Sequence, residues 1–453
     1  MSSCATYYQQ NAKINGLVQK GELLKARELL VSEGDSLRGK NRVLHQMNVG
    51  WIDYALGNYK KSISNLNNAD LYIEDYQKNY GAEALALVTN PGVKPYAPED
   101  PEKVMVNYYK ALNFLQLGDY QSALVEARRI NQKLNLLNDK YKGHKNRYAD
   151  DAFAHILMGL IYDATFDYNN AFIAYRNAVK AYDSIYTPVF GIAVPQQLKT
   201  DVLRTAYLNG FNEELSFFEN KFGLKYEHKP AEGGTLVYFW ENGFGPVKDE
   251  WSVNFSKMDG DGGMAFFQNS ELGMSFPVFL GNNNHKSGSF SDFSMLRIAF
   301  PKYLQRPTVL AGAELKTSAG SFQFEKAEDL NAILFKTLED RMLREMANSI
   351  ARLAAKKAME AAVREGDKNI GAVVGILNAV TEKADTRNWQ TLPAEISYVK
   401  VNLPEGENTV SLDFNGGRTQ QNESKTVFIT RGKTVFLNFR SLETQPPQSR
   451  YGR

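Results

Sequence analysis

The stretch Leu117-Gly118-Asp119-Tyr120-Gln121-Ser122-Ala123-Leu124 predicts a tight turn between two helices, with a small residue in the first turn of the second helix. The same pattern recurs at residues 56–63 and 166–172, and more weakly at 21–27. A helical hairpin of this kind cannot bury its apolar face alone, so it stacks on its neighbours. The recurrence therefore predicts a curved array of hairpins, a class of fold that holds other molecules.

The spacing of the turns indicates the type of repeat. The turn positions Gly21, Gly57, Gly118 and Phe166 are separated by 57−21=36, 118−57=61 and 166−118=48 residues. The first interval is close to the period of roughly 34 residues that tetratricopeptide repeats show, and the longer two imply insertions or extended helices. The helical pattern runs from Ala12 to Ala181. Residues 12–228 are therefore predicted to form an α-solenoid of about four helix pairs.

Small residues at equivalent positions of the repeats indicate where paired helices approach closely. Gly50, Ala111 and Gly159 each lie seven residues before a turn, where a small side chain suits ridges-into-grooves packing. A generic helical bundle is the alternative interpretation. The residues expected to make the packing contacts are Gly50, Gly57, Tyr59, Ala111, Gly118, Tyr120, Ala123, Gly159, Tyr168 and Ala171.

The sequence pattern of the C-terminal half predicts an α+β region. Alternating, aromatic-rich segments predict antiparallel strands at 235–240, 251–255, 276–280, 296–300 and 313–315, and again between 396 and 439. An i, i+4 apolar stripe predicts a long helix at 326–365, with acidic residues at its start. We expect the α+β region to span 229–443, with a disordered tail at 444–453. Within the solenoid, the proline-rich stretch 89–101 predicts an extended insertion.

Composition narrows the classes of function. The 453 residues carry 53 basic and 51 acidic side chains, a formal net charge of +2, which argues against a dedicated nucleic-acid binder. The five histidines are scattered, and no phosphate-binding glycine loop or nucleophile elbow is present. No window is apolar enough to predict a spanning helix. We therefore expect no metal, no cofactor and no catalytic residue.

The single cysteine lies at the N-terminus. Met1-Ser2-Ser3-Cys4 looks like the end of a bacterial lipoprotein signal, in which small residues precede a cysteine that becomes acylated. The apolar segment that should come before it is absent from this sequence. An incidental cysteine is the alternative. Residues 1–11 are interpreted as a tether.

Several motifs in order along the chain resemble an uncharacterised family of bacterial outer-membrane lipoproteins with a tetratricopeptide-like N-terminal half. They are residues 90–100 leading into 106–113, then 124–129, 241–248 and 384–393. The resemblance implies export, acylation at Cys4 and residence at the outer membrane, and it implies no known reaction. Because Ala5 to Tyr8 lack an acidic cluster, the periplasm-facing leaflet is preferred.

The same motifs supply candidate interaction residues, each with a structural alternative. Arg128 and Arg129 could offer a guanidinium to an acidic partner or pair within the chain. The turn at 241–248 could bind a partner, or its glycines and proline could serve only to fix an unusual backbone. The segment 385–389 could bind a partner, or its Asp–Arg pair and buried indole could lock the junction of helix and sheet. The candidates are Arg128, Arg129, Tyr96, Glu241, Asn242, Lys248, Asp385, Arg387 and Trp389.

These observations predict a lipid-anchored envelope scaffold that binds a protein or peptide partner on the concave face of the solenoid. One alternative is a cell-wall glycan binder that uses aromatic residues of the β region, such as Trp240 and Trp251. A second alternative is an envelope enzyme whose site assembles only in space.

Overall fold

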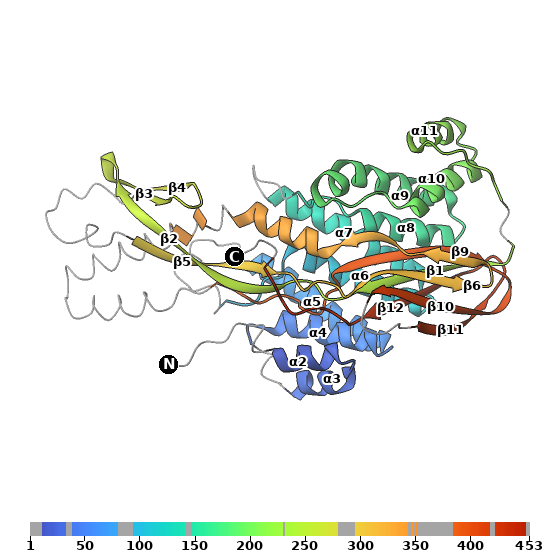
Figure 1. Cartoon of the computed structure of the whole chain (residues 1–453), viewed down its shortest axis with the longest axis horizontal. Coiled ribbons are helices and arrows are strands. Elements are labelled where there is room, and N and C mark those ends of the chain that lie inside the picture. Colours follow the sequence, from blue (N-terminus) through green and yellow to red (C-terminus); the bar gives the residue numbers. More distant parts are fainter. Residues whose placement is uncertain are drawn as a thin grey trace.

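The computed structural model of the chain describes residues 11–32, 39–79, 94–140, 147–229, 232–279, 295–342, 346–347, 349–350, 384–416 and 422–449. Cys4, most of the predicted tether and the second half of the predicted long helix lie outside these residues. The fold combines an N-terminal array of helical hairpins with three sheets from the C-terminal half (Figure 1).

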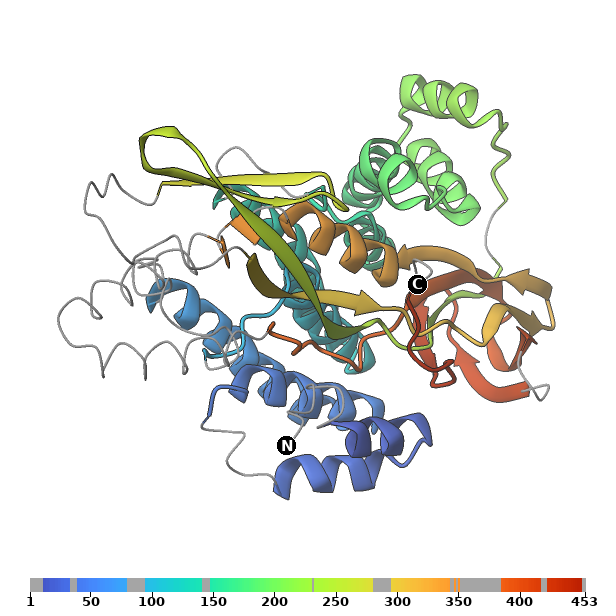
Figure 2. The same cartoon turned by 60° about the vertical axis from the view of Figure 1, so that its left-hand side comes forward.

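The array consists of consecutive helical hairpins, one pair more than the sequence predicts. Its helices are α2 (Ala12–Gln19), α3 (Leu23–Ser32), α4 (Arg42–Ala55), α5 (Tyr59–Asn79), α6 (Asp100–Gln116), α7 (Tyr120–Lys140), α8 (Ala152–Ala164), α9 (Tyr168–Ala181), α10 (Gln196–Leu208) and α11 (Asn212–Phe222). Figures 1 and 2 show the array extending from α2 and α3 at one end to α10 and α11 at the other. The tetratricopeptide-like architecture is therefore present in the described residues.

The hairpin turns share one backbone conformation. The turn residues Gly21, Gly57 and Gly118 have φ of 73°, 75° and 72°, and Phe166 has φ of 63° at the equivalent position. This left-handed region is easy for glycine and costly for residues with a Cβ. A fifth turn at Gly210, with φ of 70°, joins α10 to α11. The shared sequence pattern thus reflects a shared requirement for a positive φ.

Small residues sit where the paired helices meet. A Cβ on Gly50 would lie 2.8 Å from Leu66 of the partner helix, and a Cβ on Gly159 would lie 2.3 Å from the Tyr175 ring. Ala111 is fully buried. Of the other packing residues, Ala123 and Ala171 are buried, whereas Tyr59, Tyr120 and Tyr168 are half-buried.

The strands form three four-stranded sheets, ordered β12-β1-β9-β8, β11-β10-β6-β7 and β4-β3-β2-β5. Their bounds are β1 (Gly234–Asn242), β2 (Val247–Asp259), β3 (Met264–Asn269), β4 (Met274–Phe279), β5 (Met295–Leu304), β6 (Leu310–Thr317), β7 (Gly320–Gln323), β8 (Glu325–Asp329), β9 (Glu395–Leu403), β10 (Gly406–Gly416), β11 (Asn422–Ile429) and β12 (Thr434–Ser441). The strand pairs are antiparallel except β1 with β12, which is parallel.

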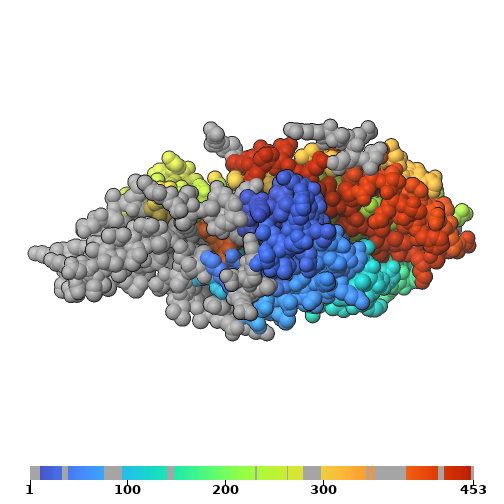
Figure 3. Space-filling view, turned by 90° about the horizontal axis from the view of Figure 1, so that it is seen from below, coloured from blue at the N-terminus to red at the C-terminus, as the bar shows by residue number. Residues whose placement is uncertain are grey.

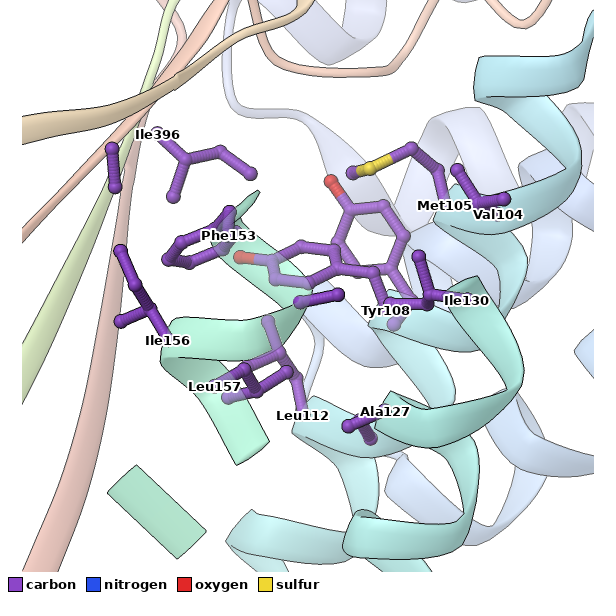
Figure 4. Packing of buried hydrophobic residues seen from close by; sticks show 14 of the residues in the cluster. Val104, Met105, Tyr108, Leu112, Ala127, Ile130, Phe153, Ile156, Leu157 and Ile396 are labelled. Carbon is purple, nitrogen blue, oxygen red and sulfur yellow. The ribbon is translucent and has the colours of Figure 1, made fainter. Parts of the chain in front are cut away.

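The first sheet lies between the helices and the second sheet. On β1, Val237 and Phe239 join the core formed with the helices, whereas Tyr238 and Trp240 join the core formed with the second sheet. This alternation follows from the two-residue period of a strand. Figure 4 shows Ile396 of β9 close to Phe153 of α8. Both faces of the first sheet are therefore buried, and the helical array shares a core with one of them.

The sheet covers the side of the array that is lined by the first helix of each hairpin, which is the concave side of a tetratricopeptide solenoid. Asn15 of α2 donates to Gln390, Gln116 of α6 donates to the Phe436 carbonyl, and Lys400 of β9 donates to Asp163 of α8. Figure 3 shows the first hairpins, in blue, directly against the C-terminal strands, in red. The prediction that this face receives a partner is corrected, because the chain's own sheet occupies it.

Four other predictions are wrong in detail. Residues 325–329 form β8 rather than the start of the long helix, and the described residues 330–342, 346–347 and 349–350 are helical. Asp100 and Pro101 begin α6 instead of ending the insertion, of which 89–93 lie outside the described residues. The tail is ordered to 449, since Thr444 and Gln448 pair with Thr308 and Gln305. The parallel pair β1–β12 departs from the antiparallel expectation.

Candidate functional site

A buried cluster of charges lies between α6, the third sheet and the helix that follows β8. We call it the charged junction. Glu99, at the start of α6, forms ion pairs with Lys248 of β2 and with Arg341, the latter at 2.5 Å. Burial acts to raise the pKa of Glu99, but the charges of Arg341 and Lys248 outweigh it and lower the pKa to about 2. The carboxylate is therefore held ionised in the interior.

The second acid of the charged junction, Glu102, ties the helix to the loop before β9. Its carboxylate accepts hydrogen bonds from the Tyr96 hydroxyl and, at 2.6 Å, from the Trp389 backbone N–H. Arg387 lies over the Tyr96 ring at 5.4 Å and pairs with Asp385 at 2.6 Å. Burial raises the pKa of Glu102, although the charge of Lys248 acts in the opposite direction.

The structure thus brings together most of the predicted interaction residues. Tyr96, Lys248, Arg387 and Trp389 are buried, and they bind other parts of this chain rather than forming a surface. Two of the separate motifs meet in space, because Lys248 and the Pro246 carbonyl both bind Asn388, and Lys248 also pairs with Glu99. Sequence reasoning did not identify Glu99, Glu102 and Arg341 as part of this cluster. Each is an ordinary charged residue in a helical segment, and nothing in its local sequence indicates a partner far away along the chain.

Glu241 and Asn242 are the last two residues of β1. The Glu241 carboxylate accepts from Arg440 at 3.1 Å and from the Tyr109 hydroxyl at 3.4 Å, and burial raises its pKa in spite of Arg440. Asn242 donates to the Leu310 carbonyl at 2.9 Å. Both side chains are buried. They too hold the first sheet in place.

Arg128 and Arg129 lie apart from the other candidates. Arg128 donates to the Tyr162 hydroxyl and lies 5.4 Å from the centre of that ring. Arg129 pairs with Glu126 of its own helix at 3.2 Å. Both arginines are exposed but engaged within the chain.

A second buried cluster, which we call the tyrosine junction, joins the array to β8. A π-helical segment, η4 (Tyr182–Phe190), follows α9 and contains Pro188. It places the Tyr186 hydroxyl 2.9 Å from the Glu328 carboxylate. Nearby, the Tyr148 hydroxyl donates to Asp151 at 2.6 Å. Burial, together with the charge of Asp151, raises the pKa of Glu328 well above its usual range.

In the described part of the chain, cavities border the first sheet on its helical side and at the ends of its strands. The first, which we call the β12 slot, has a volume of about 310 Å³ and is bordered by Trp51, Tyr54 and Tyr59 from the array and by Lys425 from β11. Its floor is residues 437–440 of β12, an edge strand. The slot therefore follows the one side of β12 that does not pair with β1.

The start of the β12 edge is already capped by the helices. The Thr434 carbonyl accepts from the Tyr120 hydroxyl at 3.1 Å, and the Phe436 carbonyl accepts from Gln116 at 3.2 Å. Asn438 and Arg440 are in phase with these two residues, so their backbone groups face the same way. No described residue makes a hydrogen bond to them from that side. Four backbone groups thus face the slot unpaired.

The second cavity, which we call the fourth-hairpin cavity, has a volume of about 670 Å³. It lies between the α8–α9 turn, α10 and the ends of β1 and β9, and its wall includes Phe166 and Tyr168. Phe166 is 53% exposed. A non-glycine residue in the left-handed region costs about 1 kcal/mol. The chain therefore places a strained, exposed ring at a position where the matching turns have glycine.

Charges within the fourth-hairpin cavity are arranged in a network. Asp163 and Asp201 both accept from Lys400 of β9 and from Arg204 of α10. Burial acts to raise the pKa of Asp163, but the charges of Lys400 and Arg204 outweigh it and lower the pKa. Each of the two acids is therefore paired with both bases.

The described residues show neither a metal-binding cluster nor a membrane-spanning helix. Within the described ranges, no three His, Cys, Asp or Glu side chains come close enough together to hold a metal ion. None of the described helices has the length and apolar character needed to cross a bilayer.

Comparisons with known proteins concern the fold alone. No family model matches the chain, and no curated protein matches it. The apo form of RapI is similar over 48% of this chain, at 13% identity and a TM-score of 0.34, and this chain covers 52% of RapI. TPR-like repeats of a kinesin light chain from Podosopora anserina are similar over 47% of this chain and 90% of that one, at 14% identity and a TM-score of 0.31.

A tetratricopeptide repeat protein from Parabacteroides merdae is similar over 50% of this chain and 81% of its own, at 15% identity and a TM-score of 0.20. All three TM-scores are low. These neighbours therefore do not indicate what this chain binds.

Proposed function

We propose that this chain is a lipid-anchored, non-enzymatic scaffold of the bacterial envelope that binds an extended segment of a protein partner as an added strand along β12. The acyl chains would be carried by Cys4, and the protein would face the periplasm from the outer membrane. The resemblance of the N-terminal residues and of the ordered motifs supports the anchor. Two or more acyl chains give stable anchoring, whereas one does not.

The single observation that supports partner binding is the unpaired edge of β12 inside the slot. An extended peptide that adds to a sheet edge gains main-chain hydrogen bonds, and side pockets provide specificity. Asn438 and Arg440 offer the backbone groups, and the rings of Trp51, Tyr54 and Tyr59 offer apolar contact. The slot takes the place of the concave face, which the chain fills itself.

Strand addition is tested with two substitutions at one residue. Asn438→Pro removes the outward N–H, which an edge strand tolerates because that group is not part of the ladder. Asn438→Ala removes only the side chain and is the matched control. With a photocrosslinking amino acid in place of Tyr59 in living cells, we expect a discrete adduct that Asn438→Ala keeps and Asn438→Pro loses. An adduct that survives the proline would contradict strand addition, provided that the thermal unfolding midpoints agree.

The anchor is tested separately. Metabolic labelling with palmitate is expected to mark the protein in cells, and Cys4→Ala is expected to abolish the label and release the protein from membranes. If the two forms fractionate alike as soluble protein, the anchor is wrong.

Glycan binding is a second candidate, favoured by one observation. Trp240 is buried and donates to Ser441, so it is not available to a ligand. Trp251, however, borders a cavity of about 410 Å³ together with Asn254 and Gln268, whose amides suit sugar hydroxyls. Sedimentation with purified cell-wall sacculi tests this function, and Trp251→Ala should leave the protein in the supernatant if the cavity is responsible.

A further inference from the structure

We propose that the fourth-hairpin cavity is a second recognition site, separate from the β12 slot, and that it binds an acidic peptide segment containing an aromatic residue. Three independent features of the cavity lead to this proposal: its exposed strained ring, its internally neutralised acids and its cationic rim.

The first feature is Phe166. Its turn has the same geometry as the turns at Gly21, Gly57 and Gly118, so the fold itself requires no side chain there. Most of the ring is exposed; it contacts Tyr168 edge to face, with the ring centres 6.4 Å apart, and reaches the Arg431–Lys433 turn near Gly432. An unfavourable backbone conformation that persists without serving the core points to a role outside it. A ring facing a cavity can stack on an aromatic ligand side chain.

The second feature is the state of the acids. Asp163 and Asp201 would repel an anionic ligand if they were free. Each is instead paired with both Lys400, at 2.6 and 2.5 Å, and Arg204. The network has equal numbers of acids and bases, so it presents no net charge to a ligand.

The third feature is the rim. His228 and Lys229 are exposed at the end of the array, and Arg431 is exposed on the β11–β12 turn. The Arg431 side chain is 78% exposed, and its pair with Glu405, at 3.4 Å, is solvated. Surface pairs of this kind are weak and exchange readily for another carboxylate. The stacked rings of Tyr207 and His228, 4.8 Å apart, extend the aromatic surface at the same place.

The charge and the shape of the fourth-hairpin cavity together indicate which class of ligand it binds. A neutral floor, a cationic rim and exposed rings favour carboxylates accompanied by an aromatic side chain. The volume of about 670 Å³ lies within the ordinary range for binding pockets.

The test uses the full chain and a defined probe, a fluorescein-labelled random copolymer of glutamate and tyrosine, with fluorescence anisotropy as the readout. The key variant is Phe166→Gly, which removes the ring and relieves the strain, so it should be at least as thermally stable as the wild type. We expect it to bind the copolymer roughly tenfold more weakly, as for an aromatic anchor at an interface. Lys229→Glu combined with Arg431→Glu should weaken binding to a similar extent.

Two controls make the result specific. Phe428→Ala removes another exposed ring, 65% exposed on β11, and should leave binding unchanged. Asn438→Pro should also leave it unchanged, which separates this site from the β12 slot; loss of binding in that variant would overturn the proposal, because the probe would then occupy the slot. Equal affinity of wild type and Phe166→Gly, equal binding of a lysine–tyrosine copolymer, or Phe166-dependent binding to phosphatidylglycerol vesicles would also overturn it, the last in favour of a membrane surface.

Discussion

The two buried junctions that hold the array against the β region solve the same problem in opposite ways. At the charged junction, Glu99 is ionised because Arg341 and Lys248 accompany it, and its pKa falls to about 2. At the tyrosine junction, Glu328 is also fully buried, but its hydrogen bond comes from the neutral Tyr186 hydroxyl, and its pKa rises. The comparison shows that burial alone does not decide the charge of a carboxyl group; the partners that the fold brings to it do.

The opposite pKa shifts of Glu99 and Glu328 make the stability of the fold depend on pH in opposite ways. A carboxyl group with a lowered pKa in the folded state stabilises the fold above its unfolded pKa, and that contribution is lost as pH falls toward the folded pKa. A carboxyl group with a raised pKa does the reverse: its contribution is complete below the unfolded pKa and is lost as pH rises toward the folded pKa. The contribution of Glu99 should therefore be lost in acid, and the contribution of Glu328 should be lost in base.

The largest effect is expected from Lys248→Met at the charged junction. This change leaves Glu99 buried with Arg341 alone, and breaking a buried ion pair costs about 3 to 5 kcal/mol of unfolding free energy. Urea denaturation at pH 7 measures it. Lys316→Met, which breaks the pair with Asp413 on the surface, is the matched control and should cost less than about 1 kcal/mol. Equal losses in both variants would show that burial does not strengthen the pair.

The next effect is the acid response of the same junction. Protonated Glu99 resembles glutamine, so the stability gap between wild type and Glu99→Gln should close as pH falls from about 4.5 to 2. From the lowered pKa, the gap should shrink by about 3 kcal/mol. Denaturation of both forms across this range measures it. A gap that does not change with pH would mean that Glu99 is not ionised in the fold.

A smaller loss is expected at the tyrosine junction from Tyr186→Phe. It removes the hydrogen bond to Glu328 and should cost about 1 to 2 kcal/mol. Tyr398→Phe is the control, because the Tyr398 hydroxyl is buried without a hydrogen-bond partner among the described residues. Thermal unfolding at pH 6 should show a lower midpoint for Tyr186→Phe and little change for Tyr398→Phe; the reverse order would contradict the assignment.

The smallest change in unfolding free energy is expected from Glu328→Gln. At high pH this change should be a gain in stability, whereas the other variants lose stability. At pH 5 it should change the unfolding free energy by less than about 1 kcal/mol, since a neutral acid is replaced by a neutral amide. As pH rises to 9, the variant should become more stable than the wild type, because glutamine has no proton to lose. If the unfolding free energy of the wild type instead rises above that of Glu328→Gln as pH increases, Glu328 is ionised in the fold. The two junctions would then not differ in the way described.

The elements that could be predicted from the sequence depend on local spacing. The turn at Gly118 and its equivalents follow from residues a few positions apart, because a left-handed backbone and a small neighbour are local requirements. The strands at 235–240 and 396–402 follow from short apolar runs rich in aromatic and β-branched residues, which suit strands with one face toward the helices and one toward the second sheet. Tyr96, Lys248 and Trp389, which come from three of the sequence motifs, meet at the charged junction.

The parts that could not be predicted depend on pairing at a distance. Glu325, Glu328 and Asp329 look like the acidic start of a helix, yet they form a strand because β9 supplies the ladder partner. The tail pairs with Gln305 and Thr308, residues over a hundred positions earlier. The local sequence of neither segment indicates which distant segment it pairs with.

What the sequence by itself determined is the array: where the helices turn, which positions must be small and which half of the chain forms strands. Only the tertiary structure decided that the sheet fills the concave face, that the pKa of Glu99 falls while that of Glu328 rises, and that Phe166 faces a cavity. The reason is physical. Backbone conformation and periodicity are set by neighbours in the chain, whereas burial, charge and exposure are set by whatever the rest of the chain places alongside.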